Sequence, residues 1–242
     1  MYKLFTSFLT SVFLVCAGFC GTARADDLAR DTSDPLYLQS IEEILSQTTL
    51  SFSDDVLRIG QRVSYGMNNR LTIGGNVHYQ NDFSGDEDGF SAVDVGGIYR
   101  LARADDNPSR VIADVLAGIK FGGSSHVRTP YFADSTFYAG MRFGRQWAGM
   151  TLAATVQSSW IFDDDRGMSF IDIMPEAYFR VAPDWRLGAG VTLRKSTNPD
   201  YNQEWISGQV VRQYGRTQYV GQVGYEFEGD DVQIGTRVNI LF

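Results

Sequence analysis

The chain has 242 residues and a formal net charge of -8; 43% of its residues are hydrophobic and 13% aromatic, with 25 glycines and only 6 prolines. The acidic balance argues against nucleic acid as a partner, because nucleic-acid-binding domains carry basic patches. Glycine and aromatic residues in these proportions are typical of many strands joined by tight turns, and they are not typical of a disordered chain.

Residues 1–25 have the pattern of a secretory signal peptide. A short positive region at Lys3 precedes an apolar run of residues 8–19, and Ala23-Arg24-Ala25 forms a small-x-small cleavage site. The apolar run is shorter than the ~20 residues that a membrane helix needs. We predict cleavage after Ala25, which would also remove both cysteines, Cys16 and Cys20. The mature chain would then have no thiol for a disulfide, a metal site or catalysis.

Residues 26–47 are predicted to form an N-terminal periplasmic segment with a short amphipathic helix. Asp34 can cap this helix, and Pro35 suits its first position. Two interpretations of the helix stay open: it is a linker at the mouth of a barrel formed by the rest of the chain, or it is a plug inside that barrel. Its apolar stripe consists of Leu38, Ile41, Ile44 and Leu45.

From Thr48 onward the hydrophobic period changes to 2, and this pattern predicts roughly twelve strands within residues 48–242. A sheet that crosses a membrane must close into a barrel, because lipid cannot satisfy the backbone groups of an open edge. No apolar run of 18 or more residues follows the signal. The expected strands are 48–53, 56–65, 70–81, 90–101, 110–121, 134–145, 150–162, 169–181, 186–196, 203–214, 217–227 and 232–242.

Two features predict that the apolar faces of these strands contact lipid. The apolar faces of most strands have no ionisable residue, and lipid excludes such residues at about 2–4 kcal/mol for an Arg or Lys at mid-membrane. Strand 203–214 does not sort cleanly into two faces, and we expect a bulge at Pro175 in strand 169–181. Aromatic residues also recur at strand ends, as in two interfacial girdles: Tyr65, Tyr79, Tyr99, Phe121, Phe143, Phe162, Phe227 and Phe242.

The last eleven residues alternate apolar and polar side chains, and they end with Val238, Ile240 and Phe242 on the apolar face. This ending resembles the C-terminal signature of Gram-negative outer-membrane β-barrel proteins, which the barrel assembly machinery reads. The resemblance implies an all-β, antiparallel, up-and-down transmembrane barrel of about twelve strands. We expect a monomer located in the cell outer membrane, in contact with its lipid and lipopolysaccharide.

The opposite faces of the strands would line the lumen with charged side chains, which need partners when buried. Asp172 is expected to lie across from Arg194, and Arg100 diagonal to Asp114. The charges could set the selectivity of a passive channel for small polar solutes, including anions, or they could cross-link a closed structural or interaction barrel. The predicted lumen-lining residues are Arg58, Arg62, His78, Asp94, Arg100, Asp114, Lys120, Arg142, Asp172, Glu176, Arg180 and Arg194.

The sequence predicts no catalytic residue, no metal site and no cofactor. His78 and His126 are the only histidines, and neither has a Ser or Asp pattern that indicates a triad. A hydrolase at the rim of the barrel is therefore a weaker alternative. The outer loops carry acidic clusters, among them Asp86-Glu87-Asp88 and Asp163-Asp164-Asp165, and we interpret these clusters as solvated surface.

Overall fold

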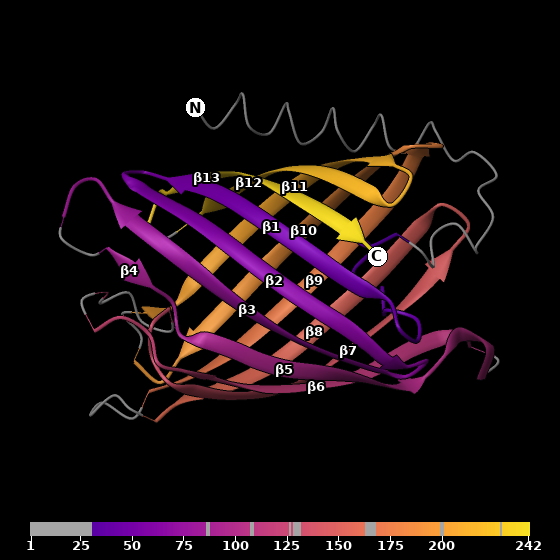
Figure 1. Cartoon of the computed structure of the whole chain (residues 1–242), viewed down its shortest axis with the longest axis horizontal. Helices are drawn as coiled ribbons and strands as arrows, with labels where there is room; N and C mark the ends of the chain where they lie inside the picture. The colour runs from indigo at the N-terminus through magenta and orange to yellow at the C-terminus, as the bar shows by residue number, and fades with distance from the viewer. Residues whose placement is uncertain are drawn as a thin grey trace.

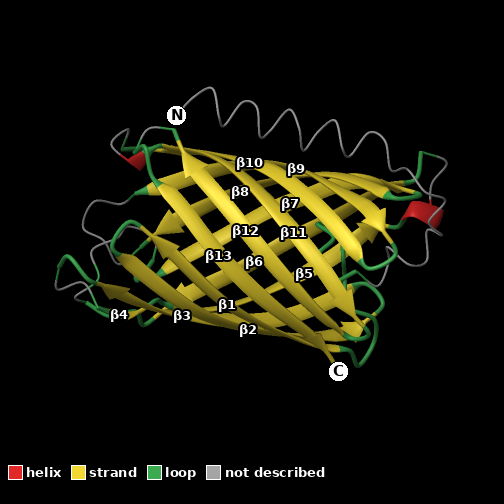
Figure 2. Cartoon of the chain, turned by 90° about the horizontal axis from the view of Figure 1, so that it is seen from above, coloured by secondary structure: helices red, strands yellow, loops and turns green. Residues whose placement is uncertain are grey.

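The computed structural model describes residues 31–85, 88–106, 109–125, 127, 132–162, 168–198, 201–227 and 229–242. These residues form one antiparallel sheet that closes into a barrel of strongly tilted strands (Figures 1 and 2). The predicted signal peptide at 1–25 and His126 lie outside the described residues.

The barrel is built from strands of 10 to 14 residues, which is enough for a tilted strand to span a bilayer. One strand of two residues, β4, extends a hairpin at the rim. The elements are β1 (Ile44–Ser53), β2 (Val56–Asn68), β3 (Leu71–Asp82), β4 (Gly89–Phe90), β5 (Val93–Ala102), the 3-10 helix η1 (Ala104–Asp106), β6 (Val111–Phe121), β7 (Thr136–Trp147), β8 (Met150–Ile161), β9 (Ser169–Ala182), β10 (Trp185–Ser196), β11 (Gln203–Tyr214), β12 (Thr217–Glu226) and β13 (Val232–Leu241).

The first and last strands close the barrel. β1 pairs with β13, with Leu45 opposite Leu241 and Ser53 opposite Gln233, and its other edge pairs with β2. Figure 1 shows β1 and β13 side by side. Because β2 also pairs with β3, the ladder is continuous around the barrel, and the expected twelve-strand closed barrel is confirmed. The outermost pairing of β3 is with β4 instead of β5.

The two ends of the barrel differ in their connections. Tight turns at residues 69–70, 148–149, 183–184 and 215–216 join strands at one end, which we call the turn end. Both the start of β1 and Phe242 also lie there, joined by a hydrogen bond of 2.8 Å from the Phe242 amide to the Ile44 carbonyl. The other end, which we call the loop end, has the longer connection from β6 to β7.

Apolar side chains cover the outside of the barrel, as the strand pattern predicts. Phe137, Met141 and Ile240 are exposed on the outer face, with 45%, 48% and 37% of their surface accessible. The polar side chains that alternate with them point into the lumen, where Asp114 and Asp172 are buried. This orientation is the reverse of a soluble barrel, and it is the arrangement that a hydrocarbon solvent favours.

Exposed aromatic residues gather near both ends of the barrel and form two girdles. All of the predicted girdle residues except Tyr79 are exposed; Tyr79 packs edge-on against Phe90, with ring centroids 5.2 Å apart. Ionisable residues on the outer face of the strands lie only near the barrel ends. At the turn end Arg145 stacks on Trp147, and Arg212 stacks on Trp185 and Tyr214. At the loop end Lys195 pairs with Glu204 at 3.1 Å.

The predicted N-terminal helix is wrong. Residues 31–43 form turns and irregular backbone, and Ile44 and Leu45 belong to β1. The segment makes its hydrogen bonds with lumen side chains instead of within a helix, because Arg100 donates to the Leu36 carbonyl and Arg142 to the Tyr37 carbonyl. Tertiary contacts therefore override the local amphipathic pattern. No helix among the described residues is long and apolar enough to cross a membrane.

The structure also settles two expectations about individual strands, one at Pro175 in β9 and one in β11. The pairing of β9 with β8 runs through Pro175 in constant register, and the irregularity between β9 and β10 lies beside Trp185 and Arg186, so the bulge expected at Pro175 is wrong. On β11, Val210 is exposed on the outer face, whereas Trp205 and Gln209 line the lumen. The poor sorting of this strand arises because an aromatic side chain faces inward.

We expect Met141→Arg, in the middle of β7 and facing outward, to lower the free energy of unfolding in phospholipid vesicles by about 2–4 kcal/mol. Val111→Arg, on the same face but at the turn end, should cost at most about 1 kcal/mol because the guanidinium reaches the interface. Urea titration followed by tryptophan fluorescence measures both values. Equal costs at the two depths would contradict lipid contact.

Candidate functional site in the lumen

Charged side chains on the inner wall form two compact ion-pair groups. Asp114 accepts a hydrogen bond from Arg100 Nε at 2.8 Å and from Arg142 Nε at 2.9 Å, so one buried carboxylate joins β5, β6 and β7. Arg100 and Asp114 are directly opposite in the ladder, not diagonal. Nearer the loop end, Arg194 Nε donates to Asp172 at 2.7 Å across β10 and β9, as predicted. These pairs neutralise buried charge that would otherwise be costly.

The N-terminal segment 31–40, which we call the stopper, enters the lumen at the turn end. Six of its ten residues are buried, and Leu36 packs against Ile112 and Ala153 on the inner wall. Its backbone carbonyls accept hydrogen bonds from Arg100 and Arg142, the same two residues that bind Asp114. The stopper is therefore attached to the ion-pair group of the wall.

Asp31 is the most highly connected residue of the stopper. Its carboxylate accepts hydrogen bonds from Arg186 Nε at 2.7 Å, from Tyr178 at 2.9 Å and from Gln218 at 2.6 Å. All four side chains are buried, and they come from the stopper and from β9, β10 and β12. Charge-assisted hydrogen bonds of this kind fix both position and orientation.

Asp34 is held differently, because no cation among the described residues is paired with it. One of its carboxylate oxygens contacts the Thr151 hydroxyl, and the other accepts a hydrogen bond of 2.8 Å from the Leu36 amide. Burial raises the pKa of the Asp34 carboxyl to about 6, and the hydrogen bonds only partly oppose that effect.

Several cavities lie in the lumen of the described structure, among them the following three. A cavity of about 230 Å³ lies between the stopper and the inner wall and is bordered by Arg62, Arg142, Glu176 and Arg237. A second cavity, of about 270 Å³, lies along β2, β3, β5, β6 and β7. A third, of about 280 Å³, lies along β9 to β13 and contains Trp205. The lumen of the described structure is thus partly filled and partly hollow.

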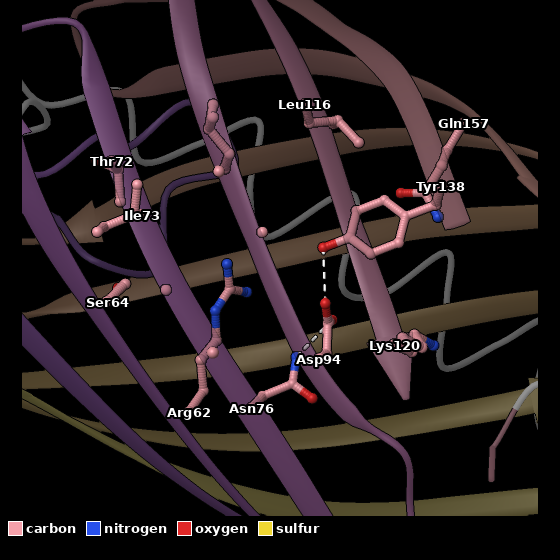
Figure 3. Close-up of a pocket in the computed structure, with 15 residues that line it drawn as sticks. Arg62, Ser64, Thr72, Ile73, Asn76, Asp94, Leu116, Lys120, Tyr138 and Gln157 are labelled. Carbon is pink, nitrogen blue, oxygen red and sulfur yellow. Dashed lines mark hydrogen bonds between the residues drawn. The ribbon is translucent and has the colours of Figure 1, made fainter. Parts of the chain in front are cut away.

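Figure 3 shows the second cavity. Tyr138 lies across a part of the wall that lacks side chains, because a Cβ atom at Gly96 or Gly118 would come within 2.3 Å of its hydroxyl. The Tyr138 hydroxyl donates to Asp94 at 2.9 Å, and Asn76 donates to the other oxygen of the same carboxylate at 2.9 Å. Arg62 extends from β2 into this cavity (Figure 3).

The comparisons with known proteins agree with this geometry. No protein-family model and no curated protein sequence matches the chain. A KdgM porin has a similar structure with a TM-score of 0.61 and 10% identity, over 81% of this chain and 98% of that one. A NanC porin gives 0.60 and 10%, over 82% and 98%. An outer membrane channel from Pseudomonas putida F1 gives 0.61 and 11%, over 86% and 98%.

The chain has the fold of a porin-like outer-membrane β-barrel. At these identities the likeness concerns the fold, so the chemistry of this porin-like barrel must be taken from its own residues.

The remaining predicted lumen residues occupy three regions of this porin-like barrel. Near the loop end, Arg58 donates to Gln80 at 2.9 Å and stacks on Phe132, with Cζ 5.4 Å from the ring centroid. His78 crosses β2 over Gly60, and Lys120 borders the second cavity with Asp94. Arg180 lies at the turn end, where it donates to the Pro183 carbonyl at 3.1 Å.

Several residues of the site were missed by the sequence analysis. Asp31 and Asp34 are the anchors of the stopper, and no sequence pattern marks them, because their partners lie more than 100 positions away. Tyr178 and Gln218 occupy inward positions that the strand pattern gives, but their role depends on Asp31. Trp205 could have been found from the irregular pattern of residues 203–214. Within the described residues, no acidic or histidine cluster has a metal-binding arrangement.

We expect the stopper to bind the lumen more weakly as the pH rises. The pKa of Asp34 is about 6 in the bound state against an ordinary 3.8, so binding favours the protonated carboxyl; this contribution is complete below pH 3.8 and is lost as the pH rises through 6. The shift corresponds to about a 100-fold change in the binding equilibrium.

Hydrogen exchange of the 31–40 backbone, corrected for the intrinsic effect of pH, measures this change. Asp34→Asn should keep the neutral hydrogen bonds and make the protection nearly independent of pH. Protection that is the same at pH 4 and pH 8 in the unaltered chain would contradict the prediction.

Proposed function

We propose that this chain is a passive channel in the cell outer membrane for small polar solutes that carry a carboxylate or another anionic group. The proposal rests on the wall formed by β1, β2 and β13. There Arg62 and Arg237 border the cavity of about 230 Å³ between the stopper and the inner wall, which we call the central cavity, and neither has an ion-pair partner among the described residues. Rings or walls of unpaired charge select permeant ions of the opposite sign.

The structural neighbours support a channel of this kind. One of the KdgM porin structures is described as a complex with disordered oligogalacturonate, a carboxylated ligand. In our proposal the turn end faces the periplasm and the loop end faces outward, after removal of residues 1–25 as a signal peptide. We further propose that the outer surface contacts lipid and lipopolysaccharide and that Val238, Ile240 and Phe242 serve as the signal for the barrel assembly machinery.

The stopper supports a second candidate function, a closed structural barrel. Hydrogen bonds attach it to most of the strands of the barrel, namely β2, β5, β7, β8, β9, β10, β12 and β13. The two candidates differ in whether the stopper can leave. In the channel the stopper is a partial or removable obstruction, whereas in the structural barrel it is a permanent part of the core.

We expect a chain that begins at Ile41 to conduct several-fold more current in planar bilayers than a chain that begins at Asp26, because the deletion removes the stopper and leaves the strands intact. Asp34→Cys with Thr151→Cys, two short side chains in contact, provides a reversible version. Its oxidised form should conduct less than its reduced form. Folded barrels that stay closed in both experiments would favour the structural barrel.

We expect Arg62→Gln to lower the ratio of chloride to potassium permeability by several-fold, because it removes an unpaired positive charge from the central cavity. Reversal potentials in a potassium chloride gradient measure the ratio. The matched variant Arg70→Gln removes an arginine that is paired with Asp106 at the turn end, at 2.9 Å, and should change the ratio little. An equal effect of both variants would indicate that only net charge matters.

A further inference from the structure

The third cavity, of about 280 Å³, has features that the channel proposal does not use. Gly188, Gly190 and Gly224 form part of its wall, the side chains of Gln209 and Trp205 lie over Gly188 and Gly224, and the cavity has side chains of mixed character. We call it the Trp205 cavity. Its principal side chains are Glu176, Thr192, Trp205, Gln209, Gln222 and Arg237.

The cavity contains one charge of each sign, and neither charge forms an ion pair with a described residue. Arg237 donates only a long hydrogen bond of 3.4 Å to Gln209, and its Nε is buried with no hydrogen-bond partner in the described structure. The Glu176 carboxylate has neither an ion pair nor a hydrogen bond with any described residue. Arg237 is half-buried and Glu176 is exposed to the lumen, so a ligand that enters the cavity can reach both charges and pair with them.

Glu176 and Arg237 attract each other across the lumen but form no ion pair in the described structure, because they project from strands that are not neighbours in the sheet. Glu176 projects from β9 and Arg237 from β13, and β10, β11 and β12 lie between these strands. The ladder fixes this separation: Glu176 is paired with Gly190, and Arg237 with Val220. A ligand with two opposite charges can reach both groups at once, whereas a singly charged ligand leaves one of them unpaired.

Trp205 supplies a third kind of contact. The other tryptophans, Trp147, Trp160 and Trp185, are exposed on the outer face in the girdles, whereas Trp205 faces inward opposite Thr192. Its ring lies against Gly224, where an added Cβ would be 3.4 Å from the indole. An indole face attracts cations, including quaternary ammonium groups.

We propose that the Trp205 cavity binds solutes that carry both a carboxylate and a cationic nitrogen. Arg237 binds the carboxylate, Glu176 and the face of Trp205 bind the cationic nitrogen, and the amides of Gln209 and Gln222 complete the polar contacts. This assignment refines the proposed channel function by naming a class of solute, and it rests on that function only for the passage of the solute, not for its binding.

The charges at the loop end favour the same class of solute. The described rim there is acidic: Asp54, Asp230 and Asp231 lie on adjacent turns, and the proximity of Asp231 raises the pKa of Asp54. The rim repels a purely anionic solute more strongly than a solute whose charges cancel, although Arg237 attracts both. A solute whose charges cancel is not repelled, and it can still match both charges of the cavity.

Three probes of almost the same shape test the proposal by calorimetric titration of the full chain in detergent micelles. Glycine betaine carries both charges, 3,3-dimethylbutanoate carries only the carboxylate, and choline carries only the quaternary ammonium. We expect betaine to bind at least about 10-fold more tightly than either singly charged probe. Equal binding of 3,3-dimethylbutanoate and betaine, or tighter binding of a neutral methyl glycoside, would overturn the proposal.

Substitutions then assign the two charges. Glu176→Gln should reduce betaine affinity to the level of 3,3-dimethylbutanoate, and Arg237→Gln should reduce it to the level of choline. Trp205→Phe should weaken betaine and choline but not 3,3-dimethylbutanoate. Arg70→Gln, at the turn end and outside the cavity, serves as the charge-removal control. Loss of betaine binding in all four variants, or in none, would contradict the assignment of the site.

Binding and conductance together separate this proposal from the channel function. Betaine binding that follows the expected variants, in a barrel that never conducts, would keep the ligand site and remove the channel. Conductance without a preference for betaine would keep the channel and remove the site.

Discussion

The whole structure depends on one constraint, which is that lipid offers no hydrogen bond to a backbone amide or carbonyl. Each strand must therefore have a partner on both edges, and the sheet must close. The pairing of β1 with both β2 and β13 meets this requirement. Once the barrel is closed, the alternation of the strands sends one set of side chains to lipid and the other to the lumen, so the constraint on the backbone also determines the chemistry of the interior.

The interior reverses the usual relation between burial and polarity. A closed barrel must fill its lumen with the polar face of every strand, and the resulting charges must be neutralised by partners or by water. Asp114 neutralises part of the charge of two arginines, and these arginines also bind carbonyls of the stopper. The stopper thus completes hydrogen bonds that the wall alone leaves open. Arg62, Arg237 and Glu176 form no ion pair in the described structure. Their charges are therefore available to a solute in the lumen.

The sequence predicted the barrel well, because a period of 2 is a local signal that lipid enforces along every strand. The strand at residues 203–214 was predicted to the residue, and β1 was predicted four residues too short, because Ile44 and Leu45 were assigned to a helix. The helix prediction was wrong because an amphipathic pattern reports only contacts between residues near in sequence. The segment is instead held by hydrogen bonds of Asp31 and Asp34 to β8, β9, β10 and β12. Ion pairs on neighbouring strands, such as Asp172 with Arg194, could be predicted from register alone.

The stopper is held in the lumen by two carboxylates, Asp31 and Asp34, whose surroundings differ. Asp31 is bound through a buried ion pair with Arg186, whose Nε lies 2.7 Å from the carboxylate. Asp34 is bound through neutral partners at the cost of its own charge, since burial raises the pKa of its carboxyl to about 6. The two carboxylates are three positions apart, but Asp31 is bound to a cation and Asp34 only to neutral donors. In the proposed channel, ionisation of Asp34 would weaken the attachment of the part around Asp34 and Leu36, while the hydrogen bonds of Asp31 would still hold the other end of the stopper.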